Sequence, residues 1–407
     1  MDWKSNTVAE LFKPLKASPF TRDELNSSGG EYLNVHYGDI LVKFPSVVDV
    51  DKEGLPFVNA TSEAKCGRCS LLQDGDIIIA DTAEDEAVGK AIEIQGTSGK
   101  KVISGLHTIA YRPQEGVFAP GFLGYFLNSS VYHNQLLPLM QGIKVLSITK
   151  TALSDTLIKY PVYEDQARIT KALLSIDALI ARLDEAIEKK GQIKRGLMQS
   201  LLTGNTRLRH NEEWEVFKLS QVGEMFAGGT PSTEIKDYWD GEVSWLHSGA
   251  IQNCYLYPCN VQRKITTKGL QNSAARIIKA GSVLVAITGA TCANIGFLTF
   301  QSAANQSVIA IETRDGFDAL FLYYKLLASR NQILSHKGGS AQSGVTLKSL
   351  SSVEVFLPTD INEQREIAKI LRNCDLEIIA LENKRDKYIL IKQGMMQQLL
   401  TGKIRLA

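Results

Sequence analysis

The sequence predicts an α+β protein with two domains of mixed helix and strand content, each followed by a copy of one long helix. Three observations lead to this prediction. A sixteen-residue phrase near the middle of the chain is nearly repeated at its end. The residues before each phrase place apolar side chains at coiled-coil spacing. The segments before these helical patterns differ between the halves and contain short β-branched runs bounded by Gly, Asp and Ser.

Length and composition are those of an ordinary globular protein. The 407 residues are 44% hydrophobic and 22% charged, which suggests two to three domains. No run of about 18 apolar residues predicts a membrane span, and the first residues lack the apolar core of a signal peptide. Six cysteines show no disulfide framework. We therefore expect a cytoplasmic protein.

The repeat extends beyond the phrase itself, which reads KRGLMQSLLTGNTRLR from Lys194 and KQGMMQQLLTGKIRLA from Lys392. A shift of 198 positions aligns residues 166–208 with residues 364–406 without a gap, and 19 of these 43 pairs are identical. Further upstream, YLNVHYGDILVKF and GGTPSTEIKDYWDGEVSWLHSGA share no pattern that we find. The chain thus consists of two different domains, each followed by one conserved element.

The conserved element predicts a long helix. Its apolar residues recur at alternating intervals of about four and three, a period of 3.5 that keeps one seam facing a partner helix. The seam residues are Ile169, Leu173, Ile176, Ile180, Leu183 and Ile187, then Ile367, Leu371, Cys374, Ile378 and Leu381. We expect the two copies to pair with each other; the alternative is burial in a globular core. DINEQ at Asp360 predicts a capping box in which Glu363 reaches back to the helix start. The Gly that ends each LLTG predicts a C-cap.

The distribution of charge tells more than the formal net charge of +1. Residues 243–311 contain no Asp or Glu but five Lys or Arg, and residues 94–114 form a second acid-free stretch. Carboxylates near phosphates are repelled, so both stretches are candidates for phosphate-facing surface. Chance combined with buried strands is the alternative.

Catalytic and metal-binding motifs are missing. The sequence has no P-loop, no dinucleotide-binding glycine pattern, no Gly-x-Ser-x-Gly elbow and no His-Glu-x-x-His. It also lacks the Asn/Asp-Pro-Pro-aromatic loop associated with methylation of base amino groups. Cys66 and Cys69, and Cys254 and Cys259, fall in different halves, so a shared zinc site is disfavoured. These absences favour a recognition or scaffold protein over an enzyme.

Several phrases resemble the specificity subunit of type I restriction–modification enzymes. They are NEQREIAKIL at Asn362, LMQSLLTG at Leu197, MMQQLLTGKIRL at Met395, GGTPSTEIKDYWDGEVSW at Gly228, GATCANIG at Gly289 and AANQSVIAI at Ala303. The first half, with YGDI and GLHTIAYRP, resembles another variant of that family's target-recognition domain. The resemblance covers essentially the whole chain.

The resemblance implies an architecture and a set of partners. Target-recognition domains would occupy residues 1–145 and 213–343, and conserved helical regions residues 146–212 and 344–407. The two helices would pair as an antiparallel coiled coil that separates the domains and gives the chain internal pseudo-two-fold symmetry. Each domain would read one half of a split double-stranded DNA sequence. Two methyltransferase (modification) subunits would dock on the chain, and restriction/translocase subunits would join them.

The same resemblance implies that this chain catalyses nothing and binds no cofactor. S-adenosylmethionine, ATP and Mg would be bound by the partners, which methylate adenine N6 and cleave DNA. A stand-alone DNA-binding regulator or adaptor of the same fold is the alternative. An enzyme with an unrecognised site is a second one.

Except for Lys43, the DNA-binding candidates come from the basic, acid-free stretches and from the Gly-rich loop at residues 228–231. This loop would either approach a phosphate closely or form a structural turn. The DNA-binding candidates are Lys43, Lys100, Lys101, His107, Gly229, Thr230, His247, Arg263, Lys264, Lys268, Thr288 and Thr291. A partner present in two copies needs two equal surfaces, so the repeated helix ends are the docking candidates: Gln199, Leu202, Thr203, Gln397, Leu400 and Thr401.

Overall fold

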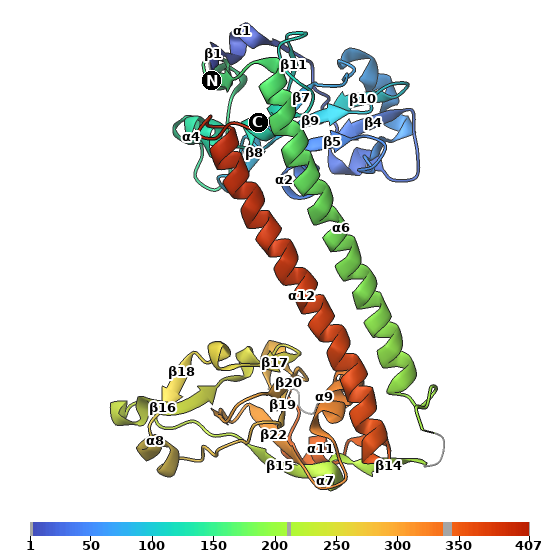
Figure 1. Ribbon diagram of the computed structural model, residues 1–407, viewed down its shortest axis with the longest axis vertical. Coiled ribbons are helices and arrows are strands. Elements are labelled where there is room, and N and C mark those ends of the chain that lie inside the picture. Colours follow the sequence, from blue (N-terminus) through green and yellow to red (C-terminus); the bar gives the residue numbers. More distant parts are fainter. Residues whose placement is uncertain (1–2, 210–212, 337–343, 407) are drawn as a thin grey trace. The chain divides into compact units, whose positions relative to one another are not determined.

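A computed structural model describes residues 3–209, 213–336 and 344–406 (Figure 1). Its contacts divide the chain into two compact units, each described by itself. Unit 1 contains residues 1–184 together with 383–407, and unit 2 contains residues 185–382. The predicted segment boundaries at residues 212 and 343 fall outside the described residues, and the predicted division at 145 and 146 remains a prediction.

Unit 1 is built around a five-stranded sheet in the order β2-β11-β7-β9-β5. These strands are β2 (Phe12–Pro14), β11 (Thr108–Pro113), β7 (Ile77–Ala80), β9 (Ala91–Gln95) and β5 (Val47–Asp49). A second sheet contains β10 (Lys101–Ser104), β4 (Tyr32–Val35), β6 (Phe57–Val58) and β3 (Leu25–Asn26). Two short pairs are β1 (Lys4–Thr7) with β13 (Leu157–Tyr160), and β8 (Thr82–Ala83) with β12 (Leu146–Ser147). Its short helices are α1 (Val8–Leu11), α2 (Tyr37–Val42), α3 (Phe122–Leu127), α4 (Ser130–Leu136) and α5 (Lys150–Ser154), with 3-10 turns η1 (Arg22–Glu24), η2 (Ala60–Arg68) and η3 (Leu137–Leu139).

Unit 2 repeats this plan. Its five-stranded sheet has the order β15-β22-β19-β20-β17. The strands are β15 (Gly223–Ala227), β22 (Val308–Thr313), β19 (Val283–Ala286), β20 (Ile295–Leu298) and β17 (Cys254–Leu256). The second sheet contains β18 (Arg263–Ile265), β16 (Trp239–Leu246) and β21 (Ala303–Ala304), and β14 (Trp214–Lys218) pairs with β23 (Glu354–Pro358). The helices are α7 (Leu219–Val222), α8 (Thr267–Gln271), α9 (Ala319–Ala328), α10 (Arg330–Ser335) and α11 (Leu347–Ser351), with 3-10 turns η4 (Lys236–Tyr238), η5 (Ser248–Ala250), η6 (Pro258–Asn260) and η7 (Gly289–Thr291).

Strand order and direction therefore match between two domains whose sequences suggested no common pattern. In both five-stranded sheets the outermost last strand, β5 or β17, runs parallel to its neighbour, while the other pairings are antiparallel. In both second sheets a parallel pair forms, β4 with β10 and β16 with β21. The duplication covers the two sheet-containing domains as well as the helices.

The predicted long helices are α6 (Tyr163–Leu201) and α12 (Ile361–Leu399), drawn green and red in Figure 1. Within unit 1, Lys392 of α12 pairs with Asp177 of α6 at 2.6 Å, and Arg385 pairs with Asp184 at 3.4 Å. Partner numbers on α12 fall as those on α6 rise, so the helices pair antiparallel.

Ion pairs in unit 2 run in the same sense. There, Lys190 pairs with Glu377 at 2.6 Å and Lys194 with Asp375 at 2.5 Å. A shift of 198 converts the Lys194–Asp375 pair into the Lys392–Asp177 pair. The expected antiparallel pairing with internal symmetry is confirmed.

Each unit's core receives both long helices. Ile169 and Leu173 near the start of α6 lie in the core of unit 1 together with Leu399 and Leu400. Residues 367 and 371 near the start of α12 lie in the core of unit 2 together with Leu201 and Leu202. The first apolar positions of each predicted seam thus belong to a globular core, which was the alternative interpretation of the pattern.

The predicted helix ends are partly correct. Gly402 adopts a left-handed φ of 72°, and the N–H of Lys403 donates to the carbonyl of Gln398, which is a glycine C-cap. The predicted capping box at Asp360 is wrong. Glu363 is fully buried and accepts from the backbone N–H of Leu208 at 3.0 Å instead of reaching back to its own helix start.

Candidate nucleic-acid interface

In unit 2, polar side chains gather where the parallel strands β16 and β21 end. His247 follows β16, and its Nδ1 accepts from the N–H of Gly249 at 3.0 Å. Because Nδ1 accepts, the proton is on Nε2, which donates to Oε1 of Gln262 at 2.9 Å. Gln306 follows β21, and its Oε1 accepts from the hydroxyl Oγ1 of Thr230 at 2.5 Å. Both glutamine side chains belong to exposed residues.

Arg263 lies beside this group on β18, where its backbone pairs with Trp245. The guanidinium carbon lies 3.7 Å from the ring centroid of Trp239, so the planar group stacks on the indole. Among the described residues, no carboxylate pairs with Arg263 or with its neighbour Lys264, and both residues are exposed. These two predicted DNA-binding residues therefore carry unneutralised positive charge.

Other cations of the acid-free stretch are neutralised by carboxylates from outside it. Lys268 lies 3.2 Å from Asp237, and Arg276 lies 3.4 Å from Glu224. Lys279 pairs with Glu312 at 2.7 Å. The absence of acids along the sequence thus overstated the positive charge of this surface, because folding brings distant carboxylates to three of its cations.

The Gly-rich loop is a close-packed turn. Gly229 is buried, and a Cβ at this position would lie 2.2 Å from the carbonyl carbon of Ala274. A Cβ on Gly228 would lie 2.2 Å from the carbonyl oxygen of Ala304. This packing fits the alternative of a structural turn, and DNA contact by Gly229 stays a prediction. Its neighbour Thr230 remains a candidate through Gln306.

Two predicted threonines lie on the loop that follows β19. Thr288 is exposed and begins the 3-10 turn η7, and the hydroxyl of Thr291 donates to the carbonyl of Thr288 at 3.4 Å. Both stay predictions.

In unit 1 the predicted cations already have acceptors. Lys43 donates to the carbonyls of Glu53 and Gly54 at 2.8 and 3.1 Å, and Lys100 lies 2.5 Å from Asp51. These contacts are exposed, and such pairs contribute only about 0–1 kcal/mol, so a phosphate can replace them at small cost.

The two remaining candidates of unit 1 show the same pattern. Lys101 pairs with Glu31, and His107 lies 3.5 Å from Asp81 and packs edge-on against Tyr37. All four residues remain predictions, weaker than Arg263 and Lys264.

One shared feature escaped the sequence comparison. His36 follows β4 as His247 follows β16, and its Nδ1 accepts from the N–H of Gly38 at 3.1 Å. Both turns read His-x-Gly-x-Ile, and both isoleucines, Ile40 and Ile251, are fully buried. The offset here is 211 rather than 198, which is why a fixed shift did not align the two turns. Burial lowers the pKa of His36, so this imidazole is held neutral.

The predicted docking residues divide into two groups. Gln199, Thr203 and Gln397 are exposed, Thr401 is partly exposed, and both threonine hydroxyls donate to the helix carbonyl four residues back. The other two, at positions 202 and 400, are only 1% exposed. These two leucines anchor the helix ends in the cores, and their assignment as docking residues stays a prediction.

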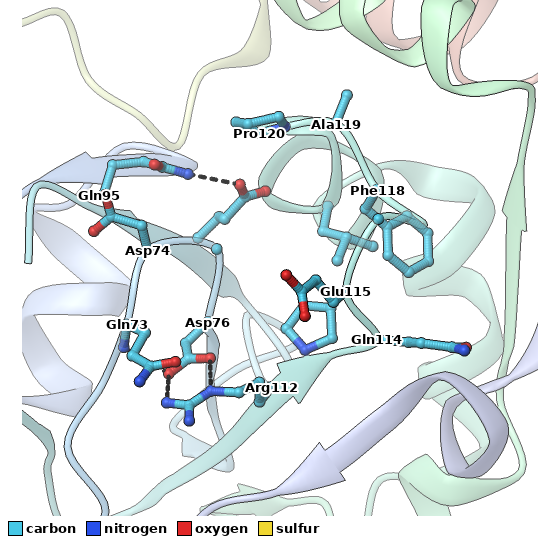
Figure 2. Close-up of a pocket in the computed structure, with 15 residues that line it drawn as sticks. Gln73, Asp74, Asp76, Gln95, Arg112, Gln114, Glu115, Phe118, Ala119 and Pro120 are labelled. Atoms are coloured by element: carbon cyan, nitrogen blue, oxygen red, sulfur yellow. Dashed lines mark hydrogen bonds and ion pairs between the residues drawn. The ribbon is translucent and has the colours of Figure 1, made fainter.

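A cavity of about 400 Å³ lies in unit 1 (Figure 2). Its one cation, Arg112, is held by both oxygens of the buried Asp76, at 2.8 and 2.7 Å. The lining also contains Asp74, Glu93 and Glu115. This excess of carboxylates repels phosphates, so the cavity does not belong to a nucleic-acid interface.

Within the described part of the chain, no three His, Cys, Asp or Glu residues converge as metal ligands. No described helix is both long and apolar enough to span a bilayer.

Known proteins share both the sequence and the fold. Residues 211–390 match the family model described as "Type I restriction modification DNA specificity domain". The chain is 25% identical over 376 residues to the "Putative type I restriction enzyme MjaX specificity subunit" of Methanocaldococcus jannaschii, and the match covers 88% of this chain and 85% of that protein. The MjaIX specificity subunit of the same organism is 31% identical over 180 residues, 43% of this chain and 40% of that protein. The solved S subunit of a type I restriction–modification system from M. genitalium matches with a TM-score of 0.62 at 14% identity, over 98% of this chain and 96% of that one, and supports the fold.

Proposed function

We propose that this chain is a specificity subunit of a type I restriction–modification enzyme and that each of its units reads one half of a split DNA sequence. A specificity subunit is not catalytic, and this chain selects the site at which other subunits act. We further propose that it docks two modification subunits and, through them, restriction subunits.

The duplication of the whole fold carries this proposal. Two units share a strand order, and the Lys194–Asp375 pair of one corresponds to the Lys392–Asp177 pair of the other. A duplicated scaffold offers two equivalent surfaces to a partner present in two copies, as a symmetric dimer does. A duplicated recognition domain with different surface residues fits two different half-sites.

The surfaces of the two units differ as separate half-sites require. In unit 2, Arg263 and Lys264 carry free charge, whereas in unit 1 Lys100 and Lys101 are paired with acids. The turn that carries His36 or His247 is common to both, so the framework is kept while the exposed groups around it change.

The chemistry belongs to the partners in this proposal. S-adenosylmethionine would be bound by the modification subunits, and ATP and Mg by the restriction subunits. Exposed side chains at the helix ends, such as Gln199 and Gln397, are the part of the repeated element that a partner can contact.

Co-expression with a type I modification subunit from the same organism tests the proposal. The purified complex should methylate adenine in a random DNA library only within one bipartite motif, and the modification subunit alone should methylate nothing specific. A complex that does not form, or methylation without sequence preference, contradicts the proposed function.

A further inference from the structure

The exposed polar groups of unit 2 at the ends of β16 and β21 share one chemical property: they donate hydrogen bonds. We infer that this surface, formed by Gln262, Arg263 and Gln306, reads a guanine in the second half-site. The inference rests on the proposed function, because it requires that unit 2 faces DNA.

The two glutamines are oriented by neighbouring donors. His247 Nε2 donates to Oε1 of Gln262, and Thr230 Oγ1 donates to Oε1 of Gln306. An amide oxygen that accepts from the protein turns its NH2 group towards the free side of the carboxamide. Among the described residues, neither NH2 group has a protein acceptor. Each exposed glutamine therefore presents donors to a ligand.

The histidine cannot reverse this arrangement by changing tautomer. Its Nδ1 already accepts from the N–H of Gly249, so the ring must keep its proton on Nε2. The same backbone contact recurs at His36 with Gly38, so the turn itself fixes the ring. Gln262 is thus locked with its oxygen towards His247.

Arg263 is held in place without losing its donors. The indole of Trp239 covers one face of the guanidinium at 3.7 Å, and Trp239 is itself buried and packed edge-on against Trp245. Stacking restricts the rotamers of a flexible side chain before any ligand arrives, which lowers the entropy lost on binding. The N–H groups along the edge of the guanidinium stay open to a ligand, since no described carboxylate pairs with them.

A surface of donors alone discriminates between base edges. In the major groove guanine shows two acceptors, O6 and N7, and a fixed arginine fork bonds both. Cytosine shows a donor, adenine shows a donor beside its acceptor, and thymine shows one acceptor beside a methyl group. Guanine is therefore the base whose edge this surface fits best, with Arg263 as the bidentate reader.

Phosphate oxygens also accept from arginine, so the experiment must separate the two acceptors. The target motif is first determined with the assembled methyltransferase. Each guanine of the second half-site is then replaced by 7-deazaguanine, which lacks N7, or by inosine, which keeps N7 and O6. Binding is measured for wild type, Arg263→Ala and Arg263→Lys.

One guanine should prove sensitive. Its 7-deaza form should bind wild type about 5- to 100-fold more weakly, the range of one bidentate base contact, while inosine is tolerated. In Arg263→Ala that penalty should disappear. Arg263→Lys keeps the positive charge but not the planar guanidinium, whose two N–H groups bond O6 and N7 together. This variant should therefore lose the guanine preference and retain affinity for random DNA.

Arg276 supplies a matched control. Its guanidinium also stacks on an aromatic ring, Phe226 at 4.1 Å, but this guanidinium already pairs with the carboxylate of Glu224. Arg276→Ala should leave the 7-deazaguanine penalty unchanged.

Two outcomes would overturn the inference: a second half-site without guanine, or an Arg263→Ala variant that weakens all duplexes equally, as a phosphate contact would. Both are distinct from failure of the proposed function, in which no sequence is methylated specifically. Thermal melting of each variant identifies any loss of folding.

Discussion

The ammonium of Lys194 lies 2.5 Å from the carboxylate of Asp375, which also accepts from the hydroxyl of Tyr324 at 2.5 Å. The same triad is formed in unit 1 by Lys392, Asp177 and Tyr125. Each triad joins a long helix to its antiparallel partner and to a short helix, α9 or α3. Side chains 13% to 23% exposed make these pairs less solvated than ordinary surface ion pairs.

The matching contacts predict similar effects of mutation in the two triads. Lys194→Ala and Lys392→Ala should each lower the free energy of unfolding by about 1–2 kcal/mol, because a partly buried carboxylate loses its cation. Arg195→Ala is the control, since Arg195 and Glu188 are both about two-thirds exposed. Denaturant titration measures all three. A change at one lysine only would show that the triads are not equivalent.

Charge placed in the helix seam should destabilise the chain. Leu183 is 6% exposed, so Leu183→Asp with Ile180→Asp buries unpaired carboxylates and should cost about 3 kcal/mol or more. Leu174 on the same helix is 41% exposed, and Leu174→Asp should change little. If the double variant melts at the wild-type temperature, these positions do not lie in a packed seam.

Unit 1 should lose stability as the pH rises from about 4.5 to 7. Burial raises the pKa of Glu93 to about 7 although its carboxylate accepts from the N–H groups of Gly121 and Gly124. The native state therefore keeps a proton that the unfolded chain has released, and native stability falls across this window, by roughly 2 kcal/mol. Glu93→Gln should remove this dependence of native stability on pH, which denaturation at pH 5 and pH 7.5 measures.

Exchange of the first domain should change one half of the target only. Replacing residues 1–145 with the corresponding domain of a relative alters the surface around His36 and leaves that around His247 unchanged. The methylated motif, determined by sequencing, should therefore keep its second half. A swap that altered both halves would show that the units do not read DNA separately.

Salt dependence should distinguish free from paired cations. Lys264→Ala should weaken binding to specific and random DNA alike. It should also reduce the salt slope, which is the slope of the logarithm of the binding constant against the logarithm of the salt concentration, by about one unit, as loss of one phosphate contact does. Lys268→Ala should reduce it less, because Asp237 already neutralises this cation. An unchanged slope for Lys264→Ala would remove this residue from the interface.

Long-range periodicity was the most informative part of the sequence. The 43-residue repeat at a shift of 198 and its 3.5-residue seam predicted both long helices and their pairing, because both can be read from the spacing of residues. Contacts between distant segments were not predictable in this way. Glu363 was assigned to a local capping box, but it accepts from Leu208 and Trp214, about 150 residues earlier in the chain.

The candidate site was predicted less well for a related reason. Basic residues could be counted, but their partners could not: Asp237, Glu224 and Glu312 lie outside the acid-free stretch and neutralise three of its cations. Gln262 and Gln306 were missed because an exposed glutamine carries no signal until its hydrogen bonds are known. The pattern His-x-Gly-x-Ile at His36 and His247 was the one available clue to the shared turn.

Synthesis of the chain imposes an order on its folding. Leu399 and Leu400 lie in the core of unit 1, whose first segment ends at position 184, whereas unit 2 is continuous from 185 to 382. At 5–20 residues per second, a ribosome needs roughly 10–40 s to add the intervening 198 residues. During this time the nascent first unit exposes an apolar gap, and the second unit can fold before the first is complete. A chain that stopped before Leu399 would therefore lack part of the interior of unit 1.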